Sequence, residues 1–300
     1  MPGIIVIGSS NTDMVIKSKK LPAPGETILG GTFLMNPGGK GANQAVAAAR
    51  LGGNVTFVTK TGNDIFGTDA LQILNNEGIN TSYIIKDAKN PSGVALINVD
   101  ETGENSIVVA PGSNASLSAY DINDEVFETN SDDLFLMQLE IPLGTVEFVA
   151  QKAVSKGNRV ILNPAPARQL SDDLLNCLYL ITPNETEAEL LTGIEVHDVV
   201  TAEKAAFKLR NKGVRNVIIT MGALGAYILS GTISKLVPVI PVKAIDTTAA
   251  GDVFNGALAV AISEGKDIED AVTFANKAAS ISVTRMGAQV SAPYRKEISK

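Results

Sequence analysis

The sequence predicts an α/β protein: a doubly wound, mostly parallel sheet flanked by helices, with a small antiparallel β lid. Along most of the 300 residues, short apolar runs that end in glycine or polar residues alternate with Ala-rich amphipathic segments. Strands that alternate with helices in this way form parallel sheets with right-handed crossovers. Two segments, at about residues 12–37 and 92–110, lack helical periodicity and predict the lid. We therefore expect a single domain over residues 1–300, with the lid segments inserted in it.

The composition excludes several classes of protein. A hydrophobic content of 45% with 19% charged residues is typical of a globular chain. No apolar run reaches the roughly 18 residues of a membrane span, and no signal peptide precedes the first apolar run, so we expect a cytoplasmic protein. The net charge of −7 argues against a nucleic acid ligand. A single cysteine, Cys177, excludes an internal disulfide and is expected in the core, and the single histidine, His197, is expected on the surface.

The first strand is expected at residues 4–7, a continuous apolar run that ends at Gly8. Asn11, Thr12 and Asp13 follow its carboxyl end. Open α/β sheets place ligand-binding residues at this end of their strands, so we regard Asn11 and Asp13 as candidate ligand contacts.

The lid is expected to contain antiparallel strands from two separate parts of the chain. Residues 14–35 consist of short alternating runs with prolines and glycines. Residues 93–99 and 104–110 flank a turn at residues 100–103, which is the pattern of a hairpin. We expect these two segments to pair into one small sheet that covers a site.

Residues 36–44, Asn-Pro-Gly-Gly-Lys-Gly-Ala-Asn-Gln, lead into an Ala-rich helix. The stretch is not a Walker A loop, because Leu34 stands where that motif has its first glycine and Gly41 follows Lys40 directly. The glycines form a flexible connection, and Lys40 and Asn43 lie one turn apart on the same helix face. The alternative is an ordinary glycine loop before an ordinary helix, with a solvated lysine.

The rest of the chain alternates between strands and helices. The expected strands are residues 55–60, 134–139, 160–162, 179–181 and 217–220, and the expected helices are residues 68–76, 144–156, 184–191, 201–212 and 268–279. Asn184 to Glu187 open one of these helices, where acidic residues are usually capping groups. Thr220 to Gly225 form a strand end followed by a glycine turn, for which the alternative is a plain β-turn.

A stretch from Asp246 to Asp252 carries the strongest chemical signal. Asp246-Thr247-Thr248 forms a polar turn, three small residues follow, and Asp252 opens an apolar helix that ends at Gly265. We expect Thr248 to be the N-cap and Gly265 to lie just beyond the helix. Small side chains in a first turn leave the backbone amides open to an anion, and a carboxylate beside them can take a proton from a hydroxyl. The alternative is that Asp252 only favours the helix dipole.

Together these motifs resemble, in register and over essentially the whole chain, the PfkB-type, ribokinase-like family of carbohydrate kinases. The residues that carry the resemblance are Asn11 to Asp13, Gly38 to Asn43, Glu140, Asn163 to Ala167, Asn184 to Glu187, Thr220 to Gly225, and Asp246 to Asp252. The resemblance implies ATP-dependent phosphorylation of D-ribose at the 5-hydroxyl, giving ribose 5-phosphate and ADP. The alternatives are a kinase for deoxyribose, fructose phosphate or adenosine, and a non-catalytic sugar sensor. A dinucleotide oxidoreductase is disfavoured, because no G-x-G-x-x-G follows the first strand.

The resemblance also implies a set of site residues. Asp252 is the catalytic base, and Ala249, Ala250 and Gly251 complete an anion hole with it. The sugar ligands are Asn11, Asp13, Gly39, Lys40, Asn43, Glu140 and Asp252, and the ATP ligands are Asn184, Thr220, Gly222, Gly225, Gly251 and Asn276. Glu187 is expected to hold Mg²⁺ through water, and Asp246, Thr248, Ser282, Arg285, Gly287 and Ser291 are expected to bind K⁺ as an activating monovalent cation. A homodimer formed through the lid is expected.

Two positions depart from the family pattern. Many relatives have a histidine where this chain has Asn276, which leaves the contact to adenine open. Many also have a glycine where this chain has Ala249, although some members share the alanine.

Overall fold

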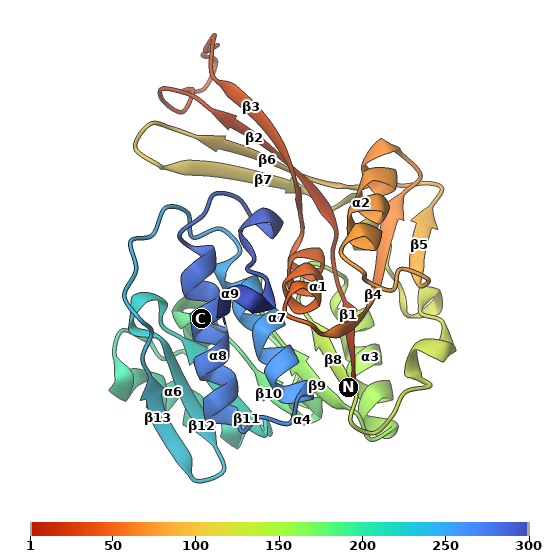
Figure 1. The fold of residues 1–300 in the computed structure, drawn as a ribbon, viewed down its shortest axis with the longest axis vertical. Helices are drawn as coiled ribbons and strands as arrows, with labels where there is room; N and C mark the ends of the chain where they lie inside the picture. Colours follow the sequence, from red (N-terminus) through yellow and green to blue (C-terminus); the bar gives the residue numbers. More distant parts are fainter. Residues whose placement is uncertain (1, 299–300) are drawn as a thin grey trace.

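The computed structural model describes residues 2–298 and contains two sheets (Figure 1). In that range the larger sheet joins nine strands in the order β13-β12-β11-β10-β9-β8-β1-β4-β5. These strands are β1 (Gly3–Ile7), β4 (Asn54–Gly62), β5 (Ile84–Asp87), β8 (Leu134–Met137), β9 (Arg159–Leu162), β10 (Leu180–Ile181), β11 (Asn216–Thr220), β12 (Ala226–Ser230) and β13 (Ile233–Val237). All neighbouring pairs from β5 to β11 are parallel. Only β12 pairs antiparallel with its neighbours, so the predicted doubly wound, mostly parallel sheet is confirmed.

Helices cover both faces of this sheet, as Figure 1 shows. They are α1 (Lys40–Arg50), α2 (Ile65–Asn76), α3 (Leu143–Ser155), α4 (Asp172–Cys177), α5 (Glu185–Thr192), α6 (Val199–Asn211), α7 (Ala250–Ser263), α8 (Ile268–Ser282) and α9 (Arg295–Ile298). Successive strand residues point to opposite faces, so Ile4 and Val6 pack with α1, α7 and α8. Ile5 and Ile7 pack with α3, α4, α5 and α6 on the other face. None of the helices in residues 2–298 has the length and apolarity needed to cross a membrane.

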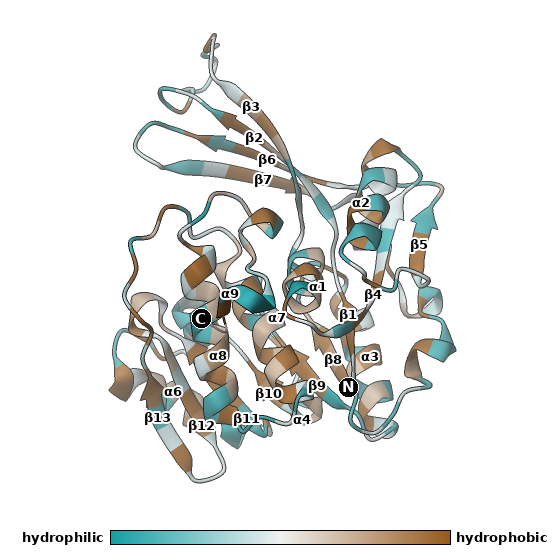
Figure 2. Cartoon of the chain, in the orientation of Figure 1, coloured by the Kyte–Doolittle hydropathy of each residue, from teal (hydrophilic) through white to brown (hydrophobic). Residues whose placement is uncertain are grey.

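The smaller sheet is the predicted lid (Figure 1). It contains β2 (Asn11–Lys17), β3 (Thr32–Gly38), β6 (Gly93–Val99) and β7 (Asn105–Ala110) in the order β3-β2-β6-β7. The pairs β2–β3 and β6–β7 are antiparallel, and the two segments join through parallel pairing of β2 with β6. The prediction that both segments form one small sheet is therefore confirmed. Phe33, Met35, Leu96 and Val108 are among the large apolar residues exposed on it. Figure 2 shows hydrophobic stretches along its strands.

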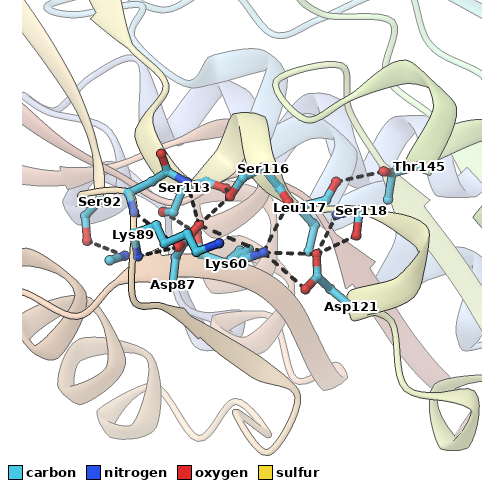
Figure 3. Close-up of polar contacts among 12 residues, drawn as sticks. Lys60, Asp87, Lys89, Ser92, Ser113, Ser116, Leu117, Ser118, Asp121 and Thr145 are labelled. Atoms are coloured by element: carbon cyan, nitrogen blue, oxygen red, sulfur yellow. Dashed lines mark hydrogen bonds and ion pairs between the residues drawn. The ribbon is translucent and has the colours of Figure 1, made fainter.

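The stem of the β6–β7 hairpin is fixed to the large sheet by a group of polar residues that we call the stem cluster: Lys60, Asp87, Ser113, Ser116 and Asp121 (Figure 3). The Lys60 ammonium donates to Asp121 Oδ2 at 3.0 Å. Ser113 Oγ donates to the Lys60 carbonyl at 2.8 Å, and Ser116 Oγ donates to Asp87 Oδ2 at 2.5 Å. Ser113 and Ser116 belong to the 3₁₀-helix η1 (Gly112–Ser116), which directly follows β7, so these bonds hold the base of the lid.

Several local predictions were wrong. The strand expected at residues 134–139 ends at Met137. Two residues further on, the Leu139 amide donates to the Ala165 carbonyl, which lies outside the sheet. Cys177 ends the short helix α4 and is only partly buried against the core. The sequence analysis also missed α4, β5 and the β12–β13 hairpin, which are four to six residues long and too short to show a period.

Candidate active site

The Asp252 carboxylate lies at the start of α7 and is 6% exposed. Two side chains of helix α1 donate to it: Asn43 Nδ2 lies 2.9 Å from Oδ2, and Gln44 Nε2 lies 3.0 Å from Oδ1. Helix α1 packs closely along α7 because Gly256 of α7 has no side chain. A Cβ at this position would lie 2.6 Å from the Gln44 carbonyl. The close approach of the two helices brings Asn43 and Gln44 to Asp252.

The N-terminus of α1 is held by Glu140, which follows β8. Glu140 Oε2 accepts a hydrogen bond from the Lys40 amide at 3.0 Å and another from Ser9 Oγ at 2.5 Å. Gly39 precedes the helix with a φ of +88°, and a Cβ there would lie 2.7 Å from the Asn11 amide. Only glycine suits both this backbone conformation and this close approach. The chain thus brings Asn11, Gly39, Lys40 and Glu140 together at one corner.

At this corner of the site, acidic side chains outnumber basic ones. Burial lowers the pKa of Lys40, but the surrounding carboxylates of Asp252, Glu140, Glu187 and Asp13 outweigh this effect and raise it. Burial and then the negative charges of Glu140 and Asp252 raise the pKa of Asp13 to about 6. Burial also raises the pKa of Asp252 and of Glu187. We call these five residues the Lys40 cluster: one lysine among four carboxylates.

Two cavities adjoin the start of α7. The larger one has a volume of about 440 Å³, and its lining includes Asn184, Thr220, Gly222, Gly225, Gly251 and Asn276, all of the residues expected to contact ATP. Its walls also carry apolar groups such as Val239, Ile240 and Phe254, as the binding of a flat base requires. The smaller cavity, of about 190 Å³, is lined by Lys40, Glu187, Ala249, Ala250, Gly251 and Asp252 among others. The expected ATP residues and the expected anion hole therefore lie side by side.

The start of α7 differs from the prediction, because Ala249 and not Thr248 is the N-cap. The Thr248 amide donates to Asp246 Oδ1 at 2.9 Å, so the Asp246 carboxylate closes the turn that Thr248 was expected to cap. Ala249 has a φ of +58°, which is a conformation that glycine adopts more readily. This backbone conformation would suit the glycine that the family resemblance led us to expect at this position. The predicted end at Gly265, with a φ of +79°, is confirmed.

Asn184 and Glu187 form a capping box at the start of α5. Asn184 Oδ1 accepts from the Glu187 amide at 2.8 Å, and Glu187 Oε2 accepts from the Asn184 amide at 2.9 Å. One oxygen of each side chain is therefore used within the helix, and both residues still line the smaller cavity. Residues 2–298 contain no group of three or more His, Cys, Asp or Glu side chains arranged to hold a metal ion.

The loops expected to bind a monovalent cation meet in the structure. Asp246 Oδ2 accepts from the Gly287 amide at 2.8 Å, and the amides of Ile245 and Asp246 both donate to the Val283 carbonyl. Ser282, at the end of α8, and Ser291, in the segment that follows it, are each 1% exposed. The Asp246 loop is thus fixed to the segment that follows α8, directly before the anion hole.

Asn276 lines the larger cavity and is 7% exposed. Its amide nitrogen donates to the Val237 carbonyl at 3.0 Å, which commits that nitrogen to the protein. The side-chain oxygen is the part of the amide left to accept from a ligand. An exocyclic amine such as that of adenine is a suitable donor.

The sequence analysis missed several polar residues that contact the candidate site residues or one another. Ser9, Gln44, Asn114 and Gln138 are all buried, and Asn163 was noted only as part of a motif. Asn114 Nδ2 donates to Asn11 Oδ1 at 2.8 Å, which fixes an expected sugar ligand from the stem of the lid. The only sequence signal for Gln138 was an amide at the end of the apolar run Leu134 to Met137.

The chain is similar to known carbohydrate kinases over its whole length. Residues 1–295 match the family model described as pfkB family carbohydrate kinase. A ribokinase of Haemophilus influenzae is 46% identical over 294 residues, which cover 98% of this chain and 96% of the relative. A deoxyribokinase of Salmonella typhi is 40% identical over 97% of this chain and 95% of its own.

A solved structure extends the likeness to three dimensions. The Arabidopsis thaliana ribokinase complexed with ribose and ATP superposes with a TM-score of 0.93 at 33% identity, covering 99% of this chain and 97% of that one. The match spans both sheets and the cavities described above. This chain belongs to the pfkB family of carbohydrate kinases.

Proposed function

We propose that this protein transfers the γ-phosphoryl group of ATP to the 5-hydroxyl of D-ribose, giving ribose 5-phosphate and ADP. The observation that carries the proposal is the position of Asp252. Its buried carboxylate lies beside the expected sugar ligands Asn43 and Lys40, and it also lines the smaller cavity, which adjoins the nucleotide-sized one. The ribokinases among its relatives, and the ribose and ATP of the Arabidopsis complex, support ribose and ATP as the substrates.

In the proposed mechanism, Asp252 takes the proton of the 5-hydroxyl as its oxygen attacks the γ-phosphorus. A bond forms between this oxygen and phosphorus, the bond from phosphorus to the β–γ bridging oxygen breaks, and ADP leaves with that electron pair. The amides at residues 249–252 and the Lys40 ammonium face the charge that develops on the phosphoryl oxygens. The Ala250 amide also donates to the Thr247 carbonyl at 3.2 Å, so those of Gly251 and Asp252 are the principal donors. Such a donor contributes about 3 kcal/mol to transition-state stabilisation.

Glu187 suits the role of an outer ligand for Mg²⁺. It is 7% exposed beside the smaller cavity, and the capping box uses only Oε2. Mg²⁺ keeps several waters when it binds proteins and phosphates, so a single carboxylate that accepts from those waters is a fitting partner. When bound, the ion neutralises charge on the ATP phosphates.

Asp13 and Asn43 favour ribose over 2-deoxyribose. Asn43 Oδ1 is a buried acceptor without a partner in residues 2–298, and Asp13 is a second acceptor nearby. A pair of neighbouring hydroxyls would satisfy both acceptors, and a buried acceptor left unpaired disfavours a substrate that lacks the hydroxyl.

An ADP-release assay with a panel of pentoses, hexoses, fructose phosphate and nucleosides tests the function. We expect kcat/KM for D-ribose to exceed that for 2-deoxyribose by about tenfold or more. A higher kcat/KM for 2-deoxyribose, fructose phosphate or adenosine would identify that compound as the substrate in place of ribose. Binding of ribose without ADP release would instead identify a sugar sensor.

We also propose that K⁺ activates the enzyme by fixing the Asp246 loop. Carbonyl groups suit a large, weakly hydrated cation, and the contacts of Asp246 with Gly287 and of Ile245 with Val283 bring two loops rich in carbonyls together. Arg285 contributes only its carbonyl, because its side chain is a donor. The proposed ion acts by preorganisation, since it would hold the following amides toward the phosphoryl group. Equal turnover in K⁺ and in tetramethylammonium at constant ionic strength would reject this site.

A homodimer formed through the lid is the proposed assembly. Phe33, Met35, Ile107 and Val108 expose between 50% and 64% of their surface on a sheet with open edges, and such edges invite a partner. Light scattering at micromolar concentration is expected to give twice the mass of the 31.3 kDa chain. Replacement of Phe33 and Val108 by Lys is expected to give the monomer mass, and a wild-type monomer would contradict the dimer.

A further inference from the structure

A chain of buried amide side chains leads from the large sheet to Asp252. Gln138, just beyond β8, and Gln44 of α1 are both fully buried. Gln138 Nε2 donates to Gln44 Oε1 at 2.6 Å, and Gln44 Nε2 donates to Asp252 Oδ1 at 3.0 Å. Gln44 Nε2 also lies 3.1 Å from Asn163 Oδ1, and Asn163 Nδ2 donates to the Thr182 carbonyl at 3.2 Å.

The direction of every amide in this chain is fixed by its neighbours. Because the Asn163 nitrogen is committed to a carbonyl, its oxygen must face Gln44. If the Gln44 amide were reversed, its oxygen would face the Asp252 carboxylate and the Asn163 oxygen, which are both acceptors. Gln44 must therefore present its nitrogen to Asp252 and its oxygen to Gln138.

Gln138 keeps this arrangement at a cost. Its Oε1 is buried and has no hydrogen-bond partner in residues 2–298. The atom lies close to Gly8, where even a Cβ would approach it to 2.1 Å. Turning the amide would put this oxygen against Gln44 Oε1, so the orphaned acceptor is the consequence of donating to Gln44. An apolar residue of similar size would avoid the free-energy cost of this unpaired oxygen. Unpaired buried polar groups are retained mainly where function requires them.

We propose that Gln44 is a positioning residue for the catalytic base and that Gln138 positions Gln44 in turn, so that the Asp252 carboxylate is held as an ionised acceptor aimed at the sugar hydroxyl. The inference rests on the proposed role of Asp252 as the base. Asn43 holds the other carboxylate oxygen at 2.9 Å. Two amide donors from one helix thus fix the plane of the carboxylate, and each oxygen keeps a lone pair for the substrate.

The proposal predicts how pH affects turnover. The charged groups that surround Asp252 are Lys40, which favours its ionised form, and Glu140, Asp13 and Glu187, which disfavour it. Hydrogen bonds from Gln44 and Asn43 also favour the ionised form. Loss of a donor therefore raises the pKa of Asp252, and the acidic limb of the kcat profile moves to higher pH.

The test compares kcat profiles from pH 5 to 9, by ADP release with saturating ribose and Mg-ATP. Gln44→Leu is expected to lower kcat at pH 6 by about 10- to 100-fold, the range for a lost hydrogen bond to a charged group, with its acidic limb about one pH unit higher. Gln138→Leu is expected to move the limb in the same direction and lower kcat by about 3- to 10-fold. In the described part of the chain Gln138 reaches Asp252 only through Gln44, so its effect reports on positioning.

Asn158→Leu is the matched control, because Asn158 is a buried amide with two hydrogen bonds at the amino end of β9, whereas the site lies beyond the carboxyl ends of the strands. It is expected to lower the melting temperature and leave the limb in place. If Gln138→Leu does not fold, Gln138→Glu keeps the shape but accepts instead of donating, and it is expected to move the limb at least as far. Folded Gln44 and Gln138 variants with a wild-type limb would overturn the proposal. An active Asp252→Asn variant would instead overturn the role of the base itself.

Discussion

The stem cluster and the Lys40 cluster use the same residue types in opposite ways. Both place a partly buried lysine among carboxylates close to the lid. In the stem cluster Lys60 donates to Asp121 and to the Ser116 carbonyl. Hydrogen bonds from Asn90 and Ser116 lower the pKa of Asp87, and Ser118 and Lys60 outweigh burial to lower that of Asp121. Every carboxylate there is stabilised in its ionised form.

In the Lys40 cluster the charges are not balanced. One lysine, Lys40, faces four carboxylates, and three of them, Asp13, Glu187 and Asp252, have raised pKa values because of burial. A carboxylate that is reluctant to ionise is a better proton acceptor at neutral pH than an ordinary one. The comparison suggests that one cluster holds the fold and the other serves the reaction. Four substitutions test this division.

The largest effect is expected for Asp252→Asn. The variant should fold and bind both substrates, and lose about 10²- to 10⁴-fold in kcat, the usual range for a missing general base. Asp267→Asn is the control, because Asp267 caps the start of α8 and asparagine caps equally well. Steady-state ADP release measures both. Turnover of Asp252→Asn within a few-fold of wild type would remove Asp252 from the mechanism.

The second effect is expected at the base of the lid. Gly39→Val introduces a branched side chain at a φ of +88°, 2.7 Å from the Asn11 amide. Gly39 is an expected sugar ligand, and it joins the lid strand β3 to α1, where we propose that the lid hinges. We therefore expect kcat to fall and KM for ribose to rise, with roughly a 10- to 100-fold loss in kcat/KM. Gly52→Val is matched to it, since Gly52 has a φ of +92° with nothing within 4 Å of a Cβ. The hinge is rejected if both variants keep wild-type kinetics.

The third effect is a pH dependence of ribose binding. The pKa of Asp13 is about 6, and its ionised form is the better acceptor for sugar hydroxyls. Ribose affinity should therefore rise about tenfold between pH 5 and pH 7, as Asp13 goes from mostly protonated to mostly ionised. Calorimetric titration measures this, and Asp13→Asn should flatten the curve. A wild-type affinity that is constant over this range would contradict the ionised role.

The raised pKa of Asp13 also makes the stability of the folded protein depend on pH. The folded pKa of Asp13 lies above its unfolded value of about 3.9, so the group stabilises the sugar-free protein fully below pH 4. That contribution is lost as the pH rises through about 6. Sugar-free Asp13→Asn should therefore lack this part of the pH dependence of unfolding.

The contrast between the clusters also explains what the sequence could predict. The parallel sheet, the lid and, to within one residue, the start of α7 follow from apolar runs, turn residues and the stretch Asp246 to Asp252. The stem cluster could not be predicted, because Lys60, Asp87 and Asp121 are ordinary charged residues until tertiary contacts bring them together. An alanine at position 249 does not indicate the left-handed backbone that the structure has there.

Gln44 and Gln138 show a second limit. Their 94-residue separation hides a 2.6 Å hydrogen bond, and neither residue type announces a function. The expected site residues came instead from a family resemblance, which names ligands of the substrates and passes over the side chains that orient those ligands.

The smallest kinetic effect is expected for Lys60→Met, which should sharpen the comparison by changing stability alone. The Lys60 side chain is 13% exposed. Its loss removes one donor from Asp121, which is 22% exposed and keeps its hydrogen bonds from Ser118, and it removes the ammonium that donates to the Ser116 carbonyl. Methionine retains the apolar stem, so we expect a loss of about 1–2 kcal/mol in the free energy of unfolding, allowing for solvent at Asp121. This corresponds to a melting temperature about 2–4 °C lower, whereas kcat/KM should stay within about twofold of wild type.

Because the pKa values of Asp87 and Asp121 are lowered in the folded protein, the stability difference should be present above pH 4 and shrink as the pH falls below it. Lys235→Met is the control, since its pair with Glu269 is about half exposed and should contribute little. Thermal unfolding from pH 3 to 8, with ADP release at neutral pH, distinguishes the two roles: a tenfold loss of kcat/KM in Lys60→Met would show that the stem cluster also serves the reaction.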